Sequence, residues 1–121
     1  VVHGSDGMDE ITLTGPTRCS ELKDGVIRTY DIDPSVYFGD PCTNADLAGG
    51  DPPENAEITR GILTGKITGP KRDIVLINSA ASLLAANRVA SLADGIAQSA
   101  AAIDSGAAYE KLQKLIEYSK M

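Results

Sequence analysis

Apolar and polar residues alternate in the first third of the chain, a pattern typical of strands with one buried face. Asp24-Gly25 separates two β-prone runs, and Asp-Gly is a strong signal for a two-residue hairpin turn. The pattern predicts a hairpin with strands at 17–22 and 26–32, and a further strand at 11–14. We also expect Val1-Val2 to end a strand that begins upstream of Val1.

Helical patterns with clear start signals fill the second half of the chain. Asp51-Pro52-Pro53-Glu54 combines a capping acid, an early proline and a glutamate at the third helical position. The run at 74–88 is apolar on nearly every face, which predicts a buried helix. Ser91 and Asp94 have the spacing of a capping box. We therefore predict helices at 52–63, 74–88 and 92–103, a fourth after Ser105-Gly106, and one helical turn near 45–48.

The order of these elements indicates an α/β fold. A chain of 121 residues with 42% hydrophobic content suffices for one domain with a core and is too short for two. We expect part of a mixed sheet flanked by helices, with a β-hairpin near the start and at least three helices after residue 50.

The net charge of −6 is unevenly distributed. Residues 1–57 contain twelve acids and three bases, a balance of −9, whereas residues 58–121 contain five acids and eight bases. Nucleic-acid binding requires a basic face, so we expect no nucleic-acid partner. No apolar run approaches the length of a membrane span, so no membrane partner is expected either.

Cys19 and Cys42 show no C-x-x-C spacing, and His3 is the single histidine. This argues against a structural zinc site. Two cysteines without a pattern are commoner in a reducing cytosol, although a disulfide between them stays open, and we expect a cytoplasmic protein.

Three carboxylates, Asp6, Asp9 and Glu10, lie close to Gly7 just before the predicted strand at 11–14. Such oxygens suit Mg²⁺, which usually keeps several waters and shares the phosphates of a substrate. Adjacent residues of a flat strand point to opposite faces, so one site requires a bend, which Gly7 would permit, or two ions. Residue types alone favour an acidic surface loop over a metal site.

Four segments together resemble anthranilate phosphoribosyltransferase, a family with a nucleoside-phosphorylase-like α/β domain. The first, VVHGSDGMDEITLTGPT, is similar to the family's Val-His-Gly and Asp-Gly-Leu-Asp-Glu segment, with Met8 replacing the usual leucine. The others are GGDPPENAEI at 49–58, RDIVLINSAASL at 72–83 and DSGAAYEKLQKL at 104–115. They occur in the family's order, and the resemblance covers essentially the whole chain.

The resemblance implies that Asp9 and Glu10 bind the Mg²⁺ carried by phosphoribosyl pyrophosphate. Asp6 does not hold the family's ligand position, and we interpret it as a turn residue or an outer acid. The implied reaction, in tryptophan biosynthesis, transfers phosphoribosyl to the amine of anthranilate and releases pyrophosphate. No residue is nominated as a general base.

Three family segments have no counterpart in this chain: a Gly-Thr-Gly-Gly-Asp loop, an Asn-x-Ser/Thr element and a Lys-His-Gly-Asn-Arg segment. By resemblance they lie upstream and hold the phosphates, ribose and anthranilate. We therefore expect residues 1–121 to be one partial domain, the C-terminal part of the catalytic α/β domain. The N-terminal helical domain, through which the family forms homodimers, and the first part of the α/β domain would be absent. Alone, the chain is expected to be inactive and to self-associate or remain bound to the missing part.

Two other functions stay open: a pyrimidine nucleoside phosphorylase, which would not need the Asp-Glu pair, and a non-catalytic nucleic-acid-binding relative. Among the other polar residues, Lys71-Arg72 is expected to be an exposed pair rather than a phosphate clamp. We expect Asn78 to be a buried amide bonded to a neighbouring backbone group. Asn44 and Asn55 lie in or beside a loop that could border the site.

Overall fold

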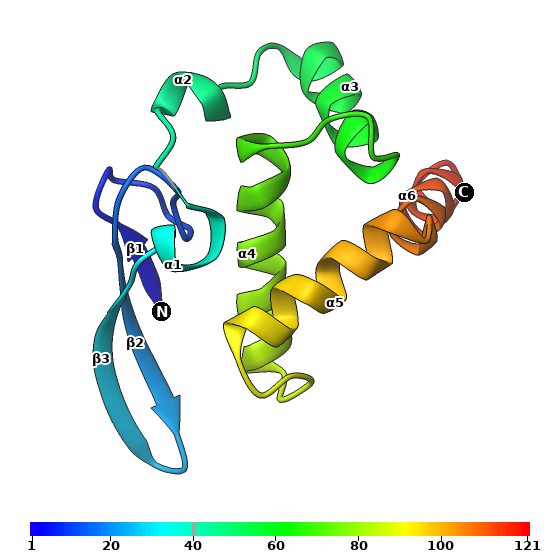
Figure 1. The fold of residues 1–121 in the computed structure, drawn as a ribbon. Helices are drawn as coiled ribbons and strands as arrows, with labels where there is room; N and C mark the ends of the chain where they lie inside the picture. Colours follow the sequence, from blue (N-terminus) through cyan, green and yellow to red (C-terminus); the bar gives the residue numbers. More distant parts are fainter. Residues whose placement is uncertain (40) are drawn as a thin grey trace. The chain divides into compact units, whose positions relative to one another are not determined.

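A computed structural model describes residues 1–39 and 41–121, which form two compact units (Figure 1). Val1–Leu47, the sheet unit, contains three strands and two short helices among its described residues. Ala48–Met121, the helical unit, contains four longer helices. The α/β class predicted from the sequence is confirmed, and so is the placement of at least three helices after residue 50.

The sheet is antiparallel in the order β1-β2-β3, with β1 at Val2–Gly4, β2 at Thr17–Lys23 and β3 at Val26–Ile32. The predicted hairpin is confirmed: Lys23 pairs with Val26, and the two turn residues, Asp24 and Gly25, have φ angles of 51° and 77°. Positive φ at both positions matches the twist of the strands, and glycine adopts it without strain. All pairings of the described strands are antiparallel, so a mixed sheet stays a prediction.

The prediction of a strand at 11–14 is wrong. Ile11 and Thr12 are 0% exposed and Leu13 is 4% exposed, so three consecutive side chains are buried, whereas a strand with one solvent face would alternate. The Thr12 N–H donates to the Thr17 hydroxyl at 3.0 Å, and the Thr14 N–H donates to the Thr12 hydroxyl at 3.2 Å. These backbone N–H groups therefore bond to threonine hydroxyls and not to the carbonyls of a neighbouring strand. Threonine side chains can compete with a strand in this way.

Two single-turn helices follow the sheet: α1 at Ser35–Phe38 and α2 at Asn44–Leu47. The α2 helix confirms the turn predicted near 45–48, whereas α1 was not predicted. Its first turn is stabilised by Asp33, whose carboxylate accepts from the Ser35 N–H at 2.9 Å and the Ser35 hydroxyl at 2.7 Å.

The helical unit consists of α3 at Pro52–Leu63, α4 at Pro70–Ala85, α5 at Leu92–Asp104 and α6 at Ala107–Tyr118. The predicted capping box of α3 is confirmed: the Asp51 carboxylate accepts from the Glu54 N–H and the Glu54 carboxylate from the Asp51 N–H, both at 3.0 Å. At α5, the Ser91 hydroxyl accepts from the Asp94 N–H at 3.1 Å and donates to the Asp94 carboxylate at 2.8 Å.

The α4 helix begins at Pro70, earlier than the predicted start at 74. Gly69 has a φ of 73° and is followed by proline at the first helical position, which is a typical helix start. The prediction rested on the apolar pattern alone and therefore missed this start. Only Leu76, Ile77 and Ala80 of α4 are fully buried, so the prediction of a helix buried on most sides is only partly right. Small and polar residues such as Ser82 lie on its exposed side.

The α4 and α5 helices pack against each other in opposite directions (Figure 1). Arg72 near the start of α4 is paired with Asp104 at the end of α5. Toward the other end of this helix pair, a Cβ added at Gly95 would lie 2.8 Å from the Ala80 Cα, so the backbones approach too closely for a side chain at this position. The sequence's small residues therefore permit this contact.

Candidate functional site

The acidic loop, which we define as residues 5–15, connects β1 to β2. Its base is closed by the Ser5 N–H, which donates to the Pro16 carbonyl at 3.0 Å. Within it, the Gly4 N–H donates to the Met8 carbonyl and the Gly7 N–H to the Gly4 carbonyl, each at 2.9 Å. Gly7 has a φ of 94°, which glycine adopts readily, so the expected bend at this glycine is present.

Asp6 organises this loop through both carboxylate oxygens. Its Oδ2 accepts from the Thr12 hydroxyl at 2.6 Å and from the Thr14 hydroxyl at 2.7 Å, while Oδ1 accepts from the Met8 N–H at 3.1 Å. The Thr12 hydroxyl bond is the main cause of a lowered Asp6 pKa. This agrees with the interpretation of Asp6 as a turn residue, because its lone pairs are used within the loop.

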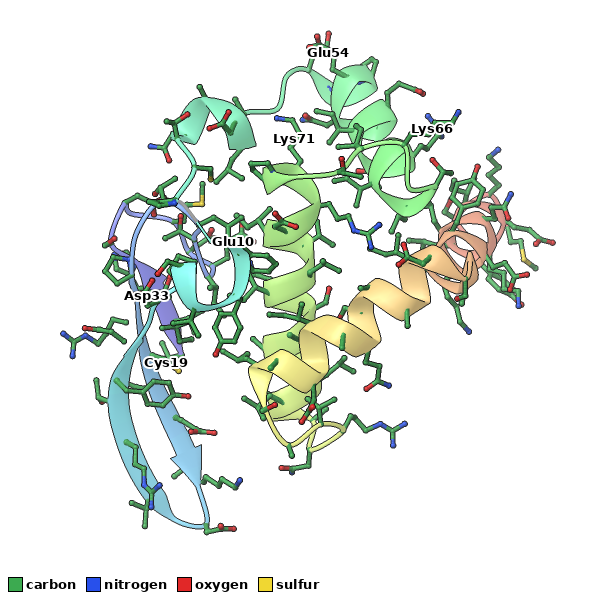
Figure 2. All side chains as sticks on the ribbon, in the orientation of Figure 1. Glu10, Cys19, Asp33, Glu54, Lys66 and Lys71 are labelled. Carbon is green, nitrogen blue, oxygen red and sulfur yellow. The ribbon has the colours of Figure 1, made fainter. Side chains whose placement is uncertain are left out.

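Asp9 and Glu10 are exposed on the same loop, and Glu10 is labelled in Figure 2. Partial burial raises the pKa of Glu10, and the negative charges of Asp9 and Asp6 raise it further. Both neighbouring acids therefore act electrostatically on Glu10. A cation bound at Glu10 would relieve the repulsion that raises its pKa.

The acids divide into one that holds the loop and two that face solvent. No group of three or more His, Cys, Asp or Glu side chains within residues 1–39 and 41–121 is arranged to hold a metal ion. A Mg²⁺ carried by substrate phosphates needs only one or two protein carboxylates, since water and phosphate oxygens complete its octahedron. Asp9 and Glu10 fit that requirement.

Lys71 and Arg72 are not the exposed pair that the sequence indicated. The Lys71 ammonium donates to the Ala48 carbonyl at 2.7 Å, and the Arg72 guanidinium donates to the Asp104 carboxylate at 2.9 Å with only 15% of the Arg72 side chain exposed. Both side chains hold parts of the helical unit together, and Figure 2 shows Lys71 near the start of α4.

Two asparagines have structural partners. The Asn78 amide donates to the Ile74 carbonyl at 3.0 Å, which confirms the predicted bond to a neighbouring backbone group, although Asn78 is only half-buried. Asn55 exchanges two 2.9 Å hydrogen bonds with the backbone of Gly50 and so fixes the turn before α3. No described contact assigns a ligand to either residue.

Sequence reasoning missed Thr12 and Thr14 as partners of Asp6. Their alternation with Ile11 and Leu13 was interpreted as the two faces of a strand. The usable signal was the acid itself: a short acidic side chain followed by two hydroxyl residues can form local side-chain bonds instead of a strand ladder.

Proteins of known family are similar to this chain over nearly its whole length. A family model described as "Glycosyl transferase family, a/b domain" matches residues 1–109. The anthranilate phosphoribosyltransferase of Desulfosudis oleivorans is 52% identical over 120 residues, which are 99% of this chain and 35% of the relative. The chain thus spans about a third of the length of the curated relatives it matches.

No helix within the described residues is both long and apolar enough to cross a membrane.

Two solved structures are similar to this chain. The anthranilate phosphoribosyltransferase of Thermus thermophilus has a TM-score of 0.87 and 33% identity, over 100% of this chain and 35% of that one. The Saccharomyces cerevisiae enzyme in complex with PRPP and Mg has a TM-score of 0.83 and 28% identity, over 96% of this chain and 33% of that one. The chain therefore belongs to the glycosyl transferase family, and the match to the α/β domain of that family covers residues 1–109.

Proposed function

We propose that this chain is the C-terminal third of an anthranilate phosphoribosyltransferase. The observation that carries the proposal is the 52% identity with a relative of that name across 99% of the chain. A further relative of the same name, from Methanobrevibacter smithii, supports the proposal and is 46% identical over 98% of the chain.

In the proposed reaction, the amine of anthranilate attacks the anomeric carbon of phosphoribosyl pyrophosphate (PRPP). The bond from that carbon to the pyrophosphate oxygen breaks, and the electron pair leaves with pyrophosphate. The amine then loses a proton, for which we nominate no acceptor on this chain. The product would enter tryptophan biosynthesis.

Asp9 and Glu10 are the residues that would hold Mg²⁺ in this reaction. When bound, Mg²⁺ neutralises charge that develops on the departing pyrophosphate. Support comes from the exposure of both carboxylates on one loop, and from a relative of similar fold whose structure is a complex with PRPP and Mg. The task of the two side chains is to orient the cation and its phosphates toward the rest of the site.

The remaining two thirds of the protein would bind the phosphates, the ribose and anthranilate. The relatives include a yeast enzyme in complex with 4-fluoroanthranilate, which supports anthranilate as the acceptor. We further propose that the full-length protein is a cytoplasmic homodimer, as the family resemblance implies.

The test is a phosphoribosyl-transfer assay with the full-length protein, in which loss of anthranilate fluorescence is followed with PRPP and Mg²⁺. We expect turnover that depends on Mg²⁺, and a loss of at least about a hundredfold in Asp9→Asn/Glu10→Gln. As a matched control, Asp31→Asn/Glu21→Gln replaces an Asp and a Glu on the β-hairpin and should keep activity.

Two results would favour the alternatives. Phosphorolysis of pyrimidine nucleosides without anthranilate transfer would identify a nucleoside phosphorylase. Tight, salt-dependent binding of nucleic acid without either activity would identify a binding protein.

A further inference from the structure

We infer that Asp6, Thr12 and Thr14 are positioning residues that hold the Asp9-Glu10 segment in the geometry for cation binding. We call these three residues the carboxylate clasp. The inference rests on the proposed function, because it assigns the clasp a role in the metal site proposed there. The inference assigns a positioning role to residues that would not bind the cation themselves.

The clasp closes across the two proposed ligands. Asp6 precedes Asp9 and Glu10 in the chain, and the two threonines follow them. The Asp6 Oδ2 accepts from Thr12 at 2.6 Å and from Thr14 at 2.7 Å, so one oxygen joins both sides of the loop. Bonds of a hydroxyl to a carboxylate at such lengths are among the stronger ones in proteins.

The clasp is bonded to the sheet through Thr12 and also packs against β1. On one side, Thr12 is 0% exposed, and its N–H donates to the Thr17 hydroxyl of β2 at 3.0 Å. On the other, a Cβ added at Gly4 of β1 would lie 2.7 Å from the Asp6 Oδ1 and 3.1 Å from the Thr12 Cγ2. The clasp therefore sits directly on the backbone of β1, and a glycine at position 4 makes room for it.

This arrangement addresses a physical difficulty of the site. Two neighbouring carboxylates repel each other and separate in a free loop, so cation binding must overcome the cost of ordering them. A loop crosslinked on both sides of the pair has lost that freedom on folding. Partners that orient metal ligands typically contribute about ten- to a hundredfold to metal affinity.

The experiment measures Mn²⁺ binding to the full-length protein by electron paramagnetic resonance, in the presence of PRPP. Asp6→Ala should weaken Mn²⁺ affinity about ten- to a hundredfold. Thr14→Val, which replaces a hydroxyl by a methyl at a half-exposed position, should also weaken it. Thr14→Ser keeps a hydroxyl at this position and should bind Mn²⁺ with the affinity of the unsubstituted protein.

Asp33→Ala is the matched control, because Asp33 also accepts from a backbone N–H and a hydroxyl, those of Ser35. It should leave Mn²⁺ affinity unchanged. Equal loss in Asp33→Ala and Asp6→Ala would show a general effect of folding and overturn the inference. So would unchanged affinity in both Asp6→Ala and Thr14→Val.

The inference can fail without the proposed function failing. If Asp9→Asn/Glu10→Gln abolishes Mn²⁺ binding and the clasp variants do not change it, the site stands and the clasp has no part in it. If Asp9→Asn/Glu10→Gln binds Mn²⁺ normally, the metal site itself is wrongly placed.

Discussion

The Arg72 guanidinium donates to the Asp104 carboxylate at 2.9 Å and joins the start of α4 to the end of α5. The two partners differ in burial: the Arg72 side chain is 15% exposed and the Asp104 side chain is 61% exposed. Loss of the acid would leave a largely buried cation without this partner. The pair therefore contributes to helix packing in a way that an exposed ion pair does not.

We predict that Asp104→Ala lowers the free energy of unfolding by about 1 kcal/mol, because a hydrogen bond to a charged group is lost while solvent at Asp104 screens part of the effect. Glu57→Ala is the control. It breaks the Arg60–Glu57 pair at 2.6 Å, whose side chains are 47% and 75% exposed, and should cost at most about 0.5 kcal/mol. Urea unfolding measures both, and equal costs would contradict the argument from burial.

Gly95→Ala should destabilise the packing of α4 on α5 by about 1–3 kcal/mol, since the new Cβ would meet the Ala80 Cβ at 2.7 Å and the Ala80 Cα at 2.8 Å. Faster hydrogen exchange of α4 and α5 amides would report the change. In an open helix the same substitution is favourable, so a more stable variant would show that the helices are not in contact at this position.

Ser99→Ala on the same helix should have the opposite sign. Ser99 is 8% exposed, and its buried hydroxyl has no hydrogen-bond partner within the described part of the chain. A buried polar group without a partner costs about 1–3 kcal/mol, so its removal should leave stability unchanged or raise it. A loss above about 1 kcal/mol in urea unfolding would indicate that the hydroxyl does have a partner.

Glu10→Gln should raise the unfolding temperature of the metal-free protein at neutral pH. The pKa of Glu10 is raised in the fold, so its stabilising contribution is present below the unfolded pKa, where the carboxyl is protonated, and is lost as pH rises through the folded pKa. The uncharged amide avoids this loss of stability. The difference in unfolding temperature between the variant and the unsubstituted protein should vanish below about pH 4. Glu117→Gln on α6 is the control and should leave the unfolding temperature unchanged. A lower unfolding temperature of Glu10→Gln at neutral pH would contradict the prediction.

The parts of the fold that could be predicted from sequence are those that depend on local chemistry. Asp24-Gly25 supplies the turn residues of the hairpin, and Asp51 and Ser91 cap their helices through bonds within a few residues. The fourth helix was also predicted, but the exposure of its apolar residues was not: Leu115 of α6 is 65% exposed. Periodicity identifies a face but does not supply what covers it.

The errors have a common physical cause. Thr12 and Thr14 match a strand pattern, yet their hydroxyls bind a carboxylate six and eight residues away, which no period of two encodes. Likewise, Arg72 has its partner 32 residues later in the chain. Residue types alone favoured an acidic surface loop, and only the family resemblance assigned Asp9 and Glu10 to a cation. The structure adds the hydrogen bonds by which Asp6 holds this loop.

The most direct test of the account is a crystal structure of the full-length protein grown with Mn²⁺ and PRPP, with anomalous diffraction locating the metal. We expect a peak within about 2.5 Å of a carboxylate oxygen of Asp9 or Glu10, bridged to pyrophosphate oxygens, with Asp6 still bonded to Thr12 and Thr14. A metal held only by phosphates, water or other side chains, with Asp9 and Glu10 turned to solvent, would contradict the account.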